Sequence, residues 1–126
     1  KRINDNYGHT HGDMVLGTIG QLTNSIARQS DIPARYGGEE FAVILPNTPS
    51  EGALEVANRL GSIIREHKFE GLDGEQVTIS SGTSTFTENN VQSCDQLVQL
   101  ADKAMYNAKL LGKDRTSQEG MLSSCA

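Results

Sequence analysis

The sequence lacks the features of several protein classes. Its 126 residues contain no apolar run that approaches the roughly 20 residues needed to cross a bilayer, so we expect no membrane contact from this segment. A net charge of −5 leaves no basic excess to coat polymeric nucleic acid. No signal peptide is visible, and Cys94 and Cys125 have neither paired disulfide spacings nor a C-x-x-C metal signature. These absences indicate a reduced, cytoplasmic setting.

The composition suits one soluble globular domain. Hydrophobic residues make up 36% of the chain and charged residues 21%. A domain of this length buries roughly two thirds of the surface that its unfolded chain exposes. We expect the domain to occupy residues 1–116 and residues 117–126, which have little pattern, to form a disordered tail.

Three segments have helical periodicity. Apolar residues recur at three- and four-residue steps from Asp13 to about Gln29, and Asp13 is placed to cap the free amides at the start of that helix. The capping box Thr48–Glu51 predicts a second helix. Ser93 can cap a third helix, which Gly112 ends.

Three other segments predict strands. The strand at 31–36 contains Pro33, which favours an edge strand or a start at Ala34. Residues 41–45 are apolar on both faces, so we expect this strand to be buried on both sides. Residues 77–86 alternate, and Gly82 marks a place where another backbone comes close.

The order of these elements predicts an α+β fold. It corresponds to a ferredoxin-like βαββαβ layout in which helices pack on an antiparallel or mixed sheet. The first, central strand of that layout is absent from this sequence, because the chain opens on Lys1 after the point where the strand would end.

The segment Arg35–Phe41 carries two adjacent glycines and two adjacent carboxylates. Gly37 and Gly38 predict a two-residue hairpin turn with positive φ, and a backbone without Cβ atoms can lie close to a phosphate. Glu39 and Glu40 can hold a hard divalent cation. A plain turn with solvated carboxylates is the alternative.

Basic residues cluster near the end of the chain, at Lys103, Lys109, Lys113 and Arg115. Lys109 and Lys113 lie four residues apart, so we expect them on one helical face where both can reach the same polyphosphate. Solvated lysines that favour a helix C-terminus are the other interpretation.

Three motifs together resemble the GGDEF domains, which are diguanylate cyclases. The segment Arg35–Phe41 is similar to the family signature in its GGEEF form, residues 1–13 to the lead into its first helix, and residues 101–113 to its last helix. The resemblance implies a sheet like the palm of nucleotidyl cyclases. It also implies a homodimer that condenses two GTP molecules into cyclic di-GMP and two pyrophosphates with Mg²⁺ or Mn²⁺.

The resemblance assigns roles to particular residues. Glu39 and Glu40 would bind metal, and Glu39 would assist deprotonation of the 3′-hydroxyl. Asn4 and Asp13 would read guanine, although a turn-forming asparagine and a helix cap explain them equally well. The full set of substrate-binding residues would be Lys1, Asn4, His9, Asp13, Gly37, Gly38, Lys109 and Lys113.

Arg28 and Asp31 match the R-x-x-D product-inhibition site of many cyclases, where they would bind cyclic di-GMP. An arginine and an aspartate three residues apart also occur by chance on protein surfaces. A guanidinium fork can meet the Hoogsteen edge of guanine, and the carboxylate can face its Watson–Crick edge.

Two features depart from the family pattern. The Asp-x-Asp stretch that ends the first strand and supplies a metal ligand is missing, so we interpret the chain as a segment of a longer protein. Lys113 stands where arginine is more usual, which predicts weaker phosphate binding. The alternatives to an enzyme are a non-catalytic receptor for cyclic di-GMP and an interaction module of the same fold.

Overall fold

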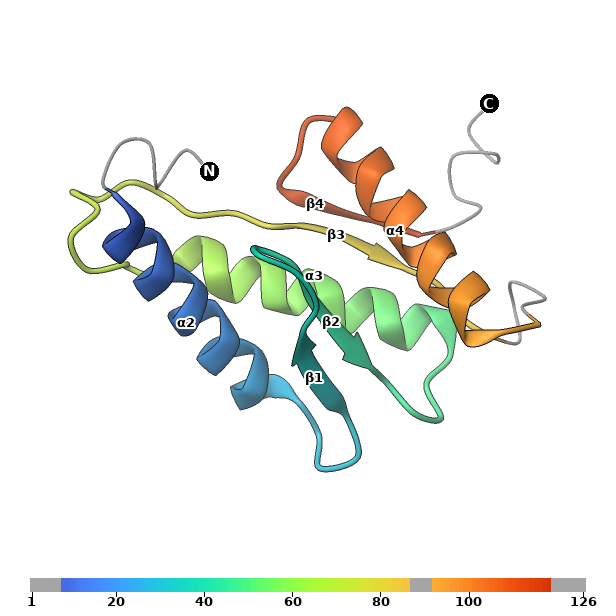
Figure 1. Cartoon of the computed structure of the whole chain (residues 1–126). Helices are drawn as coiled ribbons and strands as arrows, with labels where there is room; N and C mark the ends of the chain where they lie inside the picture. The colour runs from blue at the N-terminus through green and yellow to red at the C-terminus, as the bar shows by residue number, and fades with distance from the viewer. Residues whose placement is uncertain (1–7, 87–91, 119–126) are drawn as a thin grey trace. The chain divides into compact units, whose positions relative to one another are not determined.

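The computed structural model describes residues 8–86 and 92–118. Along the chain its elements are α2 (His9–Ile26), β1 (Ile32–Arg35), β2 (Phe41–Ile44), α3 (Ser50–Glu66), β3 (Ser80–Thr83), α4 (Cys94–Leu110) and β4 (Arg115–Gln118) (Figure 1). Helices combined with small sheets confirm the predicted α+β class. None of the helices in these described ranges has the length and hydropathy needed to cross a membrane.

The four strands of the described residues form two pairs. β1 and β2 are antiparallel, with Ile32 opposite Ile44 and Arg35 opposite Phe41. β3 and β4 are parallel, with Ser80 opposite Arg115. Within the described residues the pairs are not joined into the single sheet that the βαββαβ order predicts. The chain also divides into two compact units, residues 1–46 with 63–77 and residues 47–62 with 78–126, and α3 contributes to both.

In the first unit α2 contacts the hairpin of β1 and β2. A Cβ added to Gly20 would lie 3.6 Å from a ring carbon of Phe41, so the helix and the strand are close there. The apolar stripe of α2 is buried at Val15 and Ile19. The buried apolar residues of this unit are Val15, Ile19, Ile64, Phe69, Leu72 and Val77.

Two expectations for this unit are corrected, and one of two options for the first strand is confirmed. The first helix begins at His9 with Gly8 as its N-cap, so Asp13 lies beyond the first turn and does not cap it. β1 begins at Ile32 and includes Pro33, and within the described residues it pairs on one side only, which confirms the option of an edge strand. β2 is not buried on both sides, since Ile44 is 61% exposed.

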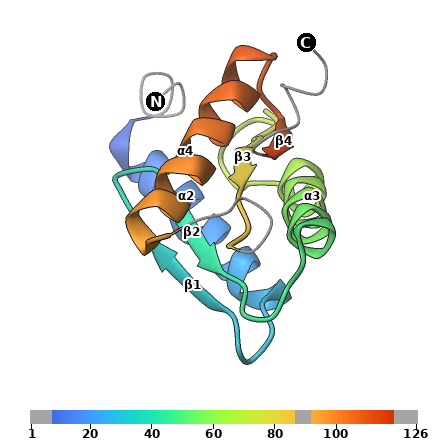
Figure 2. The same cartoon turned by 90° about the vertical axis from the view of Figure 1, so that its right-hand side faces the viewer.

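In the second unit α4 lies along β3 and β4 (Figure 2). The Oγ of Ser93 accepts a hydrogen bond from the backbone N–H of Gln96 at 3.1 Å, which confirms the predicted cap. A Cβ on Gly82 would lie 2.1 Å from the carbonyl oxygen of Ala101 and 2.2 Å from the nitrogen of Met105. The predicted close approach of another backbone at Gly82 is therefore confirmed, and α4 is that backbone.

The strands of this unit differ from the prediction. The third predicted strand is limited to Ser80–Thr83 instead of residues 77–86. The segment Arg115–Gln118, which we expected to be partly tail, forms β4, and Ser117 is only 4% exposed. The remainder of the expected tail, residues 119–126, lies outside the described residues.

Candidate functional site

The tip of the β1–β2 hairpin carries the glycines and the carboxylates. The backbone N–H of Tyr36 donates to the carbonyl of Glu40 at 2.9 Å, and that of Gly37 donates to the same oxygen at 3.2 Å. The tip is therefore a three-residue loop, Gly37–Glu39, and not the predicted two-residue turn. Neither Gly37 nor Gly38 has positive φ, so the turn does not require glycine for that reason.

Lack of space for a side chain can explain the glycine at position 37 but not the one at position 38. A Cβ on Gly37 would lie 3.0 Å from Oε1 of Glu40, whereas a Cβ on Gly38 would have no heavy atom within 4 Å. Gly38 is exposed, and so is Glu39, while Glu40 is half-buried. The backbone at Gly38 is thus open to an approaching ligand, with two carboxylates immediately after it.

Arg35 braces this tip, a role that the sequence did not indicate. Its guanidinium donates to the carbonyl of Gly38 and lies 5.9 Å from the centre of the Phe41 ring. A cation over an aromatic face is attracted by the ring. The sequence itself shows only a basic residue two positions before the first glycine of the turn.

Glu39 and Glu40 have the chemistry of a site for Mg²⁺ or Mn²⁺. Carboxylate oxygens are hard ligands of the kind that these ions prefer. Residues 8–86 and 92–118 bring together no group of three or more acidic, histidine or cysteine side chains that could hold a metal ion. The two glutamates therefore fit as part of a metal shell and do not complete one.

The residues at the N-terminal end that are predicted to bind the guanine nucleotide are only partly described. Lys1 and Asn4 lie outside the described residues. His9 is the first residue of α2, and Asp13 is exposed on the same helix, beyond its first turn. Since Asp13 does not cap the helix, the capping explanation of this residue is wrong and the guanine-reading role stays a prediction.

The two predicted phosphate-binding lysines belong to the second unit. Lys109 is exposed in the last turn of α4, which ends at Leu110. Lys113 follows the helix and has φ of 65°, so the two lysines do not share a helical face as we expected. They come instead from a helix end and from the loop that leaves it.

Arg28 and Asp31 form a closed ion pair between α2 and β1. Nη2 of Arg28 lies 2.9 Å from Oδ1 of Asp31, and Nε lies 3.1 Å from the same oxygen. The backbone N–H of Arg28 donates to Oδ2 at 2.8 Å. These bonds lower the pKa of Asp31 below its usual range, and the carboxylate raises the pKa of Arg28. The R-x-x-D residues are therefore paired with each other.

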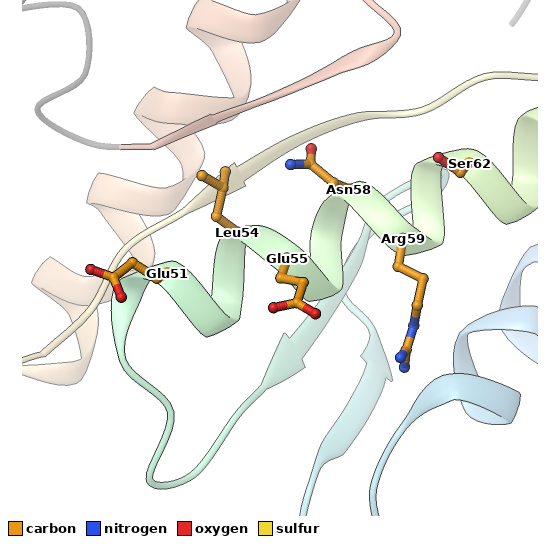
Figure 3. A pocket seen from close by; sticks show the side chains of 6 residues that line it. All are labelled: Glu51, Leu54, Glu55, Asn58, Arg59 and Ser62. Atoms are coloured by element: carbon orange, nitrogen blue, oxygen red, sulfur yellow. The ribbon is translucent and has the colours of Figure 1, made fainter.

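A groove runs along the first part of α3 (Figure 3). Leu54, Asn58 and Ser62 follow one another along one side of the helix at four-residue steps. The residues that line the groove are Glu51, Leu54, Glu55, Asn58, Arg59 and Ser62. None of the predicted site residues lines this groove.

Comparison with known proteins agrees with the motifs. The family model described as "Diguanylate cyclase, GGDEF domain" matches residues 1–115. Diguanylate cyclase A of Treponema denticola is 41% identical over 119 residues, which is 93% of this chain and 32% of the relative. Diguanylate cyclase DosC of Escherichia coli is 34% identical over 115 residues, 91% of this chain and 25% of the relative. The chain thus spans about a third or less of the length of these curated relatives.

Solved structures are similar as well. The active GGEEF domain of a diguanylate cyclase from Vibrio cholerae matches with a TM-score of 0.86 and 31% identity, over 93% of this chain and 74% of that one. The GGDEF domain of DgcB from Caulobacter crescentus, solved in complex with c-di-GMP, matches with a TM-score of 0.85 and 26% identity, over 93% and 70%. With nearly the whole chain matched by the family model, this chain belongs to the GGDEF family of diguanylate cyclase domains.

Proposed function

We propose that this chain is the catalytic domain of a cytoplasmic diguanylate cyclase. It would condense two GTP molecules into cyclic di-GMP and release two pyrophosphates. The observation that carries this proposal is the hairpin tip, where the open backbone at Gly38 is followed directly by Glu39 and Glu40. Membership of the GGDEF family and relatives that are named diguanylate cyclases support it.

The reaction sets the requirements of the site. Each 3′-hydroxyl attacks the α-phosphorus of the other GTP, a new P–O bond forms, and the bond to pyrophosphate breaks. The hydroxyl proton must leave, and the negative charge of the triphosphate must be balanced. Because each GTP supplies one nucleophile and one electrophile, we propose a homodimer in which two half-sites face each other.

The residues of this chain can meet these requirements in part. Glu39 and Glu40 would hold Mg²⁺ or Mn²⁺, which when bound stabilises phosphate charge and acidifies a coordinated hydroxyl. Glu39 is also the candidate acceptor of the 3′-hydroxyl proton. Gly37 and Gly38 would allow the triphosphate to lie against the backbone, since neither residue has a side chain of its own.

The remaining contacts would come from both ends of the chain. Asn4 and Asp13 would select guanine, because a carboxylate accepts from the ring N–H and the exocyclic amine. Lys1 and His9 would contribute to nucleotide binding, and Lys109 and Lys113 would bind the triphosphate as point charges. For Arg28 and Asp31 we propose feedback binding of cyclic di-GMP, which would have to compete with their own ion pair.

A receptor that binds cyclic di-GMP without catalysis is the alternative. The retention of both glutamates at the tip favours the enzyme, since a pure receptor has no need of metal-binding carboxylates. Calorimetric titration distinguishes the two, because the enzyme binds GTP and cyclic di-GMP whereas the receptor binds only the second.

The deciding experiment measures cyclic di-GMP formation from GTP and magnesium by the intact protein that carries this chain. Glu39→Ala should lower the turnover about 100-fold or more, the loss expected when charge stabilisation in the transition state is removed. Glu70→Ala removes another exposed carboxylate, from a loop that carries no residue of the proposed site, and serves as the control. An inactive wild-type protein, or a fully active Glu39→Ala variant with an unchanged melting temperature, would refute the proposal.

A further inference from the structure

The loop that leaves α4 has an unusual backbone. Gly112, Lys113 and Asp114 have φ of 120°, 65° and 48°, so three successive residues lie at positive φ. The N–H of Gly112 donates to the carbonyl of Lys109 at 3.3 Å, and that of Lys113 donates to the carbonyl of Ala108 at 3.0 Å. This is the hydrogen-bond pattern of a Schellman cap, in which only the first residue after the cap needs positive φ.

Lys113 is the least suited of the three to this conformation. Glycine has no Cβ to clash, and aspartate is enriched at positive φ. Lysine has neither advantage, so its conformation carries a backbone cost that contacts outside the cap can offset. The exposed side chain of Lys113 is one of the two predicted to bind the triphosphate.

Arg115 makes the contacts that can hold Lys113. Its Nε donates to the carbonyl oxygen of Lys113 at 3.0 Å. Its Nη2 lies 2.9 Å from the position that a Cβ on Gly112 would occupy, so the guanidinium folds back over the glycine. The missing side chain at Gly112 gives the guanidinium room to reach the loop.

Arg115 is itself held by the sheet. It is the first residue of β4 and stands opposite Ser80 of β3 in the parallel pair. Because the backbone of Arg115 belongs to β4 and its side chain bonds the Lys113 carbonyl, Arg115 connects the loop to the β3–β4 pair. The backbone of Lys113, from which its side chain projects, is therefore bonded to an arginine two residues further along the chain.

We infer that Arg115 is a positioning residue for Lys113 and that it raises the affinity for the triphosphate of GTP without contacting the phosphates. The inference rests on the proposed function, in which Lys109 and Lys113 bind that triphosphate. The flexible stem of a lysine loses entropy when it binds, and a loop that already holds the residue in one conformation reduces that loss.

The first test measures the loop and needs no activity. Amide hydrogen exchange is followed in the intact protein without nucleotide, for the wild type, Arg115→Ala and Arg115→Gln. Arg115→Ala should speed exchange at the Lys113 amide about tenfold, and Arg115→Gln, which keeps an N–H donor, should restore most of the protection. Unchanged exchange in Arg115→Ala would overturn the inference whether or not the protein is a cyclase.

The second test measures the consequence for catalysis. Arg115→Ala should raise KM for GTP about 3- to 10-fold, the effect of one lost hydrogen bond, while kcat changes less than about twofold. Arg115→Gln should return KM close to the wild-type value, and Lys68→Ala, which removes an exposed charge elsewhere, should leave it unchanged.

The variants also separate positioning from charge. If Arg115→Lys restores KM and Arg115→Gln does not, the charge of Arg115 acts directly and the positioning role is wrong. If the wild-type protein neither binds GTP nor makes cyclic di-GMP, the proposed function fails, and the exchange measurement still decides whether Arg115 holds Lys113.

Discussion

Arg28 and Asp31 hold each other through two atoms of the guanidinium and both oxygens of the carboxylate, with a shortest distance of 2.9 Å between side-chain nitrogen and oxygen. The side chain of Asp31 is only 2% exposed, whereas that of Arg28 is 54% exposed. Nη2 of Arg28 also donates to the carbonyl of Pro46 at 3.2 Å. The pair therefore ties the end of α2 and the start of β1 to the segment that follows β2.

This pair should make the stability of the protein depend on pH. The pKa of Asp31 is lower in the folded state than its ordinary value of about 3.9, so the carboxylate stabilises the fold above that value. The stabilisation should be lost as the pH falls through the folded pKa. We expect Asp31→Asn to lower the melting temperature by about 3–6 °C at pH 7, and the difference from wild type to shrink below about pH 4.

Thermal melts from pH 7 to pH 3 of wild type, Asp31→Asn and Asp73→Asn check this prediction. Asp73 is exposed in a loop, so it controls for the loss of one acidic group. If the difference in melting temperature between wild type and Asp31→Asn stays constant from pH 7 to pH 3, the charge of Asp31 does not stabilise the fold.

The ion pair of Arg28 and Asp31 also bears on the proposed feedback inhibition by cyclic di-GMP. A ligand that uses the guanidinium of Arg28 must compete with the carboxylate of Asp31, so binding requires this pair to rearrange. Arg28→Ala should raise the concentration of cyclic di-GMP needed for half-inhibition about tenfold or more, because a charge-assisted contact is lost. Inhibition curves for wild type and for Lys68→Ala provide the comparison. An unchanged curve for Arg28→Ala would remove Arg28 from the feedback site.

Gly82 should tolerate no side chain. A Cβ there would lie 2.1 Å from the carbonyl oxygen of Ala101, and backbone atoms cannot turn away as the end of a flexible side chain can. We expect Gly82→Ala to destabilise the protein by about 3 kcal/mol or more. Gly61→Ala is the matched control, because a Cβ on this glycine of α3 meets no heavy atom within 4 Å.

Chemical denaturation of both variants measures the difference. Gly61→Ala should be neutral or up to about 1 kcal/mol more stable than wild type, since alanine is the better helix former. Equal stability of Gly82→Ala and Gly61→Ala would contradict the close packing of α4 on β3.

Gly38→Ala separates folding from ligand approach. A Cβ at this position has no neighbour within 4 Å and the backbone is not at positive φ, so the melting temperature should not change. If the triphosphate lies against this backbone, the added methyl should raise KM for GTP about tenfold. Gly17→Ala, at an exposed glycine in α2 with open space around it, should leave KM unaltered. A normal KM for Gly38→Ala would place the triphosphate elsewhere.

The helices were predictable from the sequence because their signals are local. The Ser93 cap and the apolar positions that follow it gave the start of α4 correctly, and the segment Thr48–Glu51 located the start of α3. α2 begins at His9, four residues before Asp13. The sequence did not reveal this start because the N-cap, Gly8, has no side-chain acceptor and so leaves no capping signal.

The strands were harder to predict because their partners decide them. β4 has the sequence Arg-Thr-Ser-Gln, which lacks any apolar alternation, and Ser117 is buried only because β3 and α4 lie beside it. In the candidate site, too, the residues of the motif were predictable from the sequence and the contacts of individual side chains were not. The glycines and glutamates were visible as a motif, whereas the bracing contacts of Arg35 and Arg115 depend on how the chain folds back on itself.

The parallel pairing of β3 and β4 has a consequence for the order of folding. Two parallel strands cannot be joined by a tight turn, so the chain must run through all of α4 before Arg115 reaches Ser80. Closing that loop costs entropy before any strand hydrogen bond forms. We therefore expect α4 to dock on β3 through Gly82 first and β4 to join last, which makes the loop that carries Lys113 a late-forming part of the second unit.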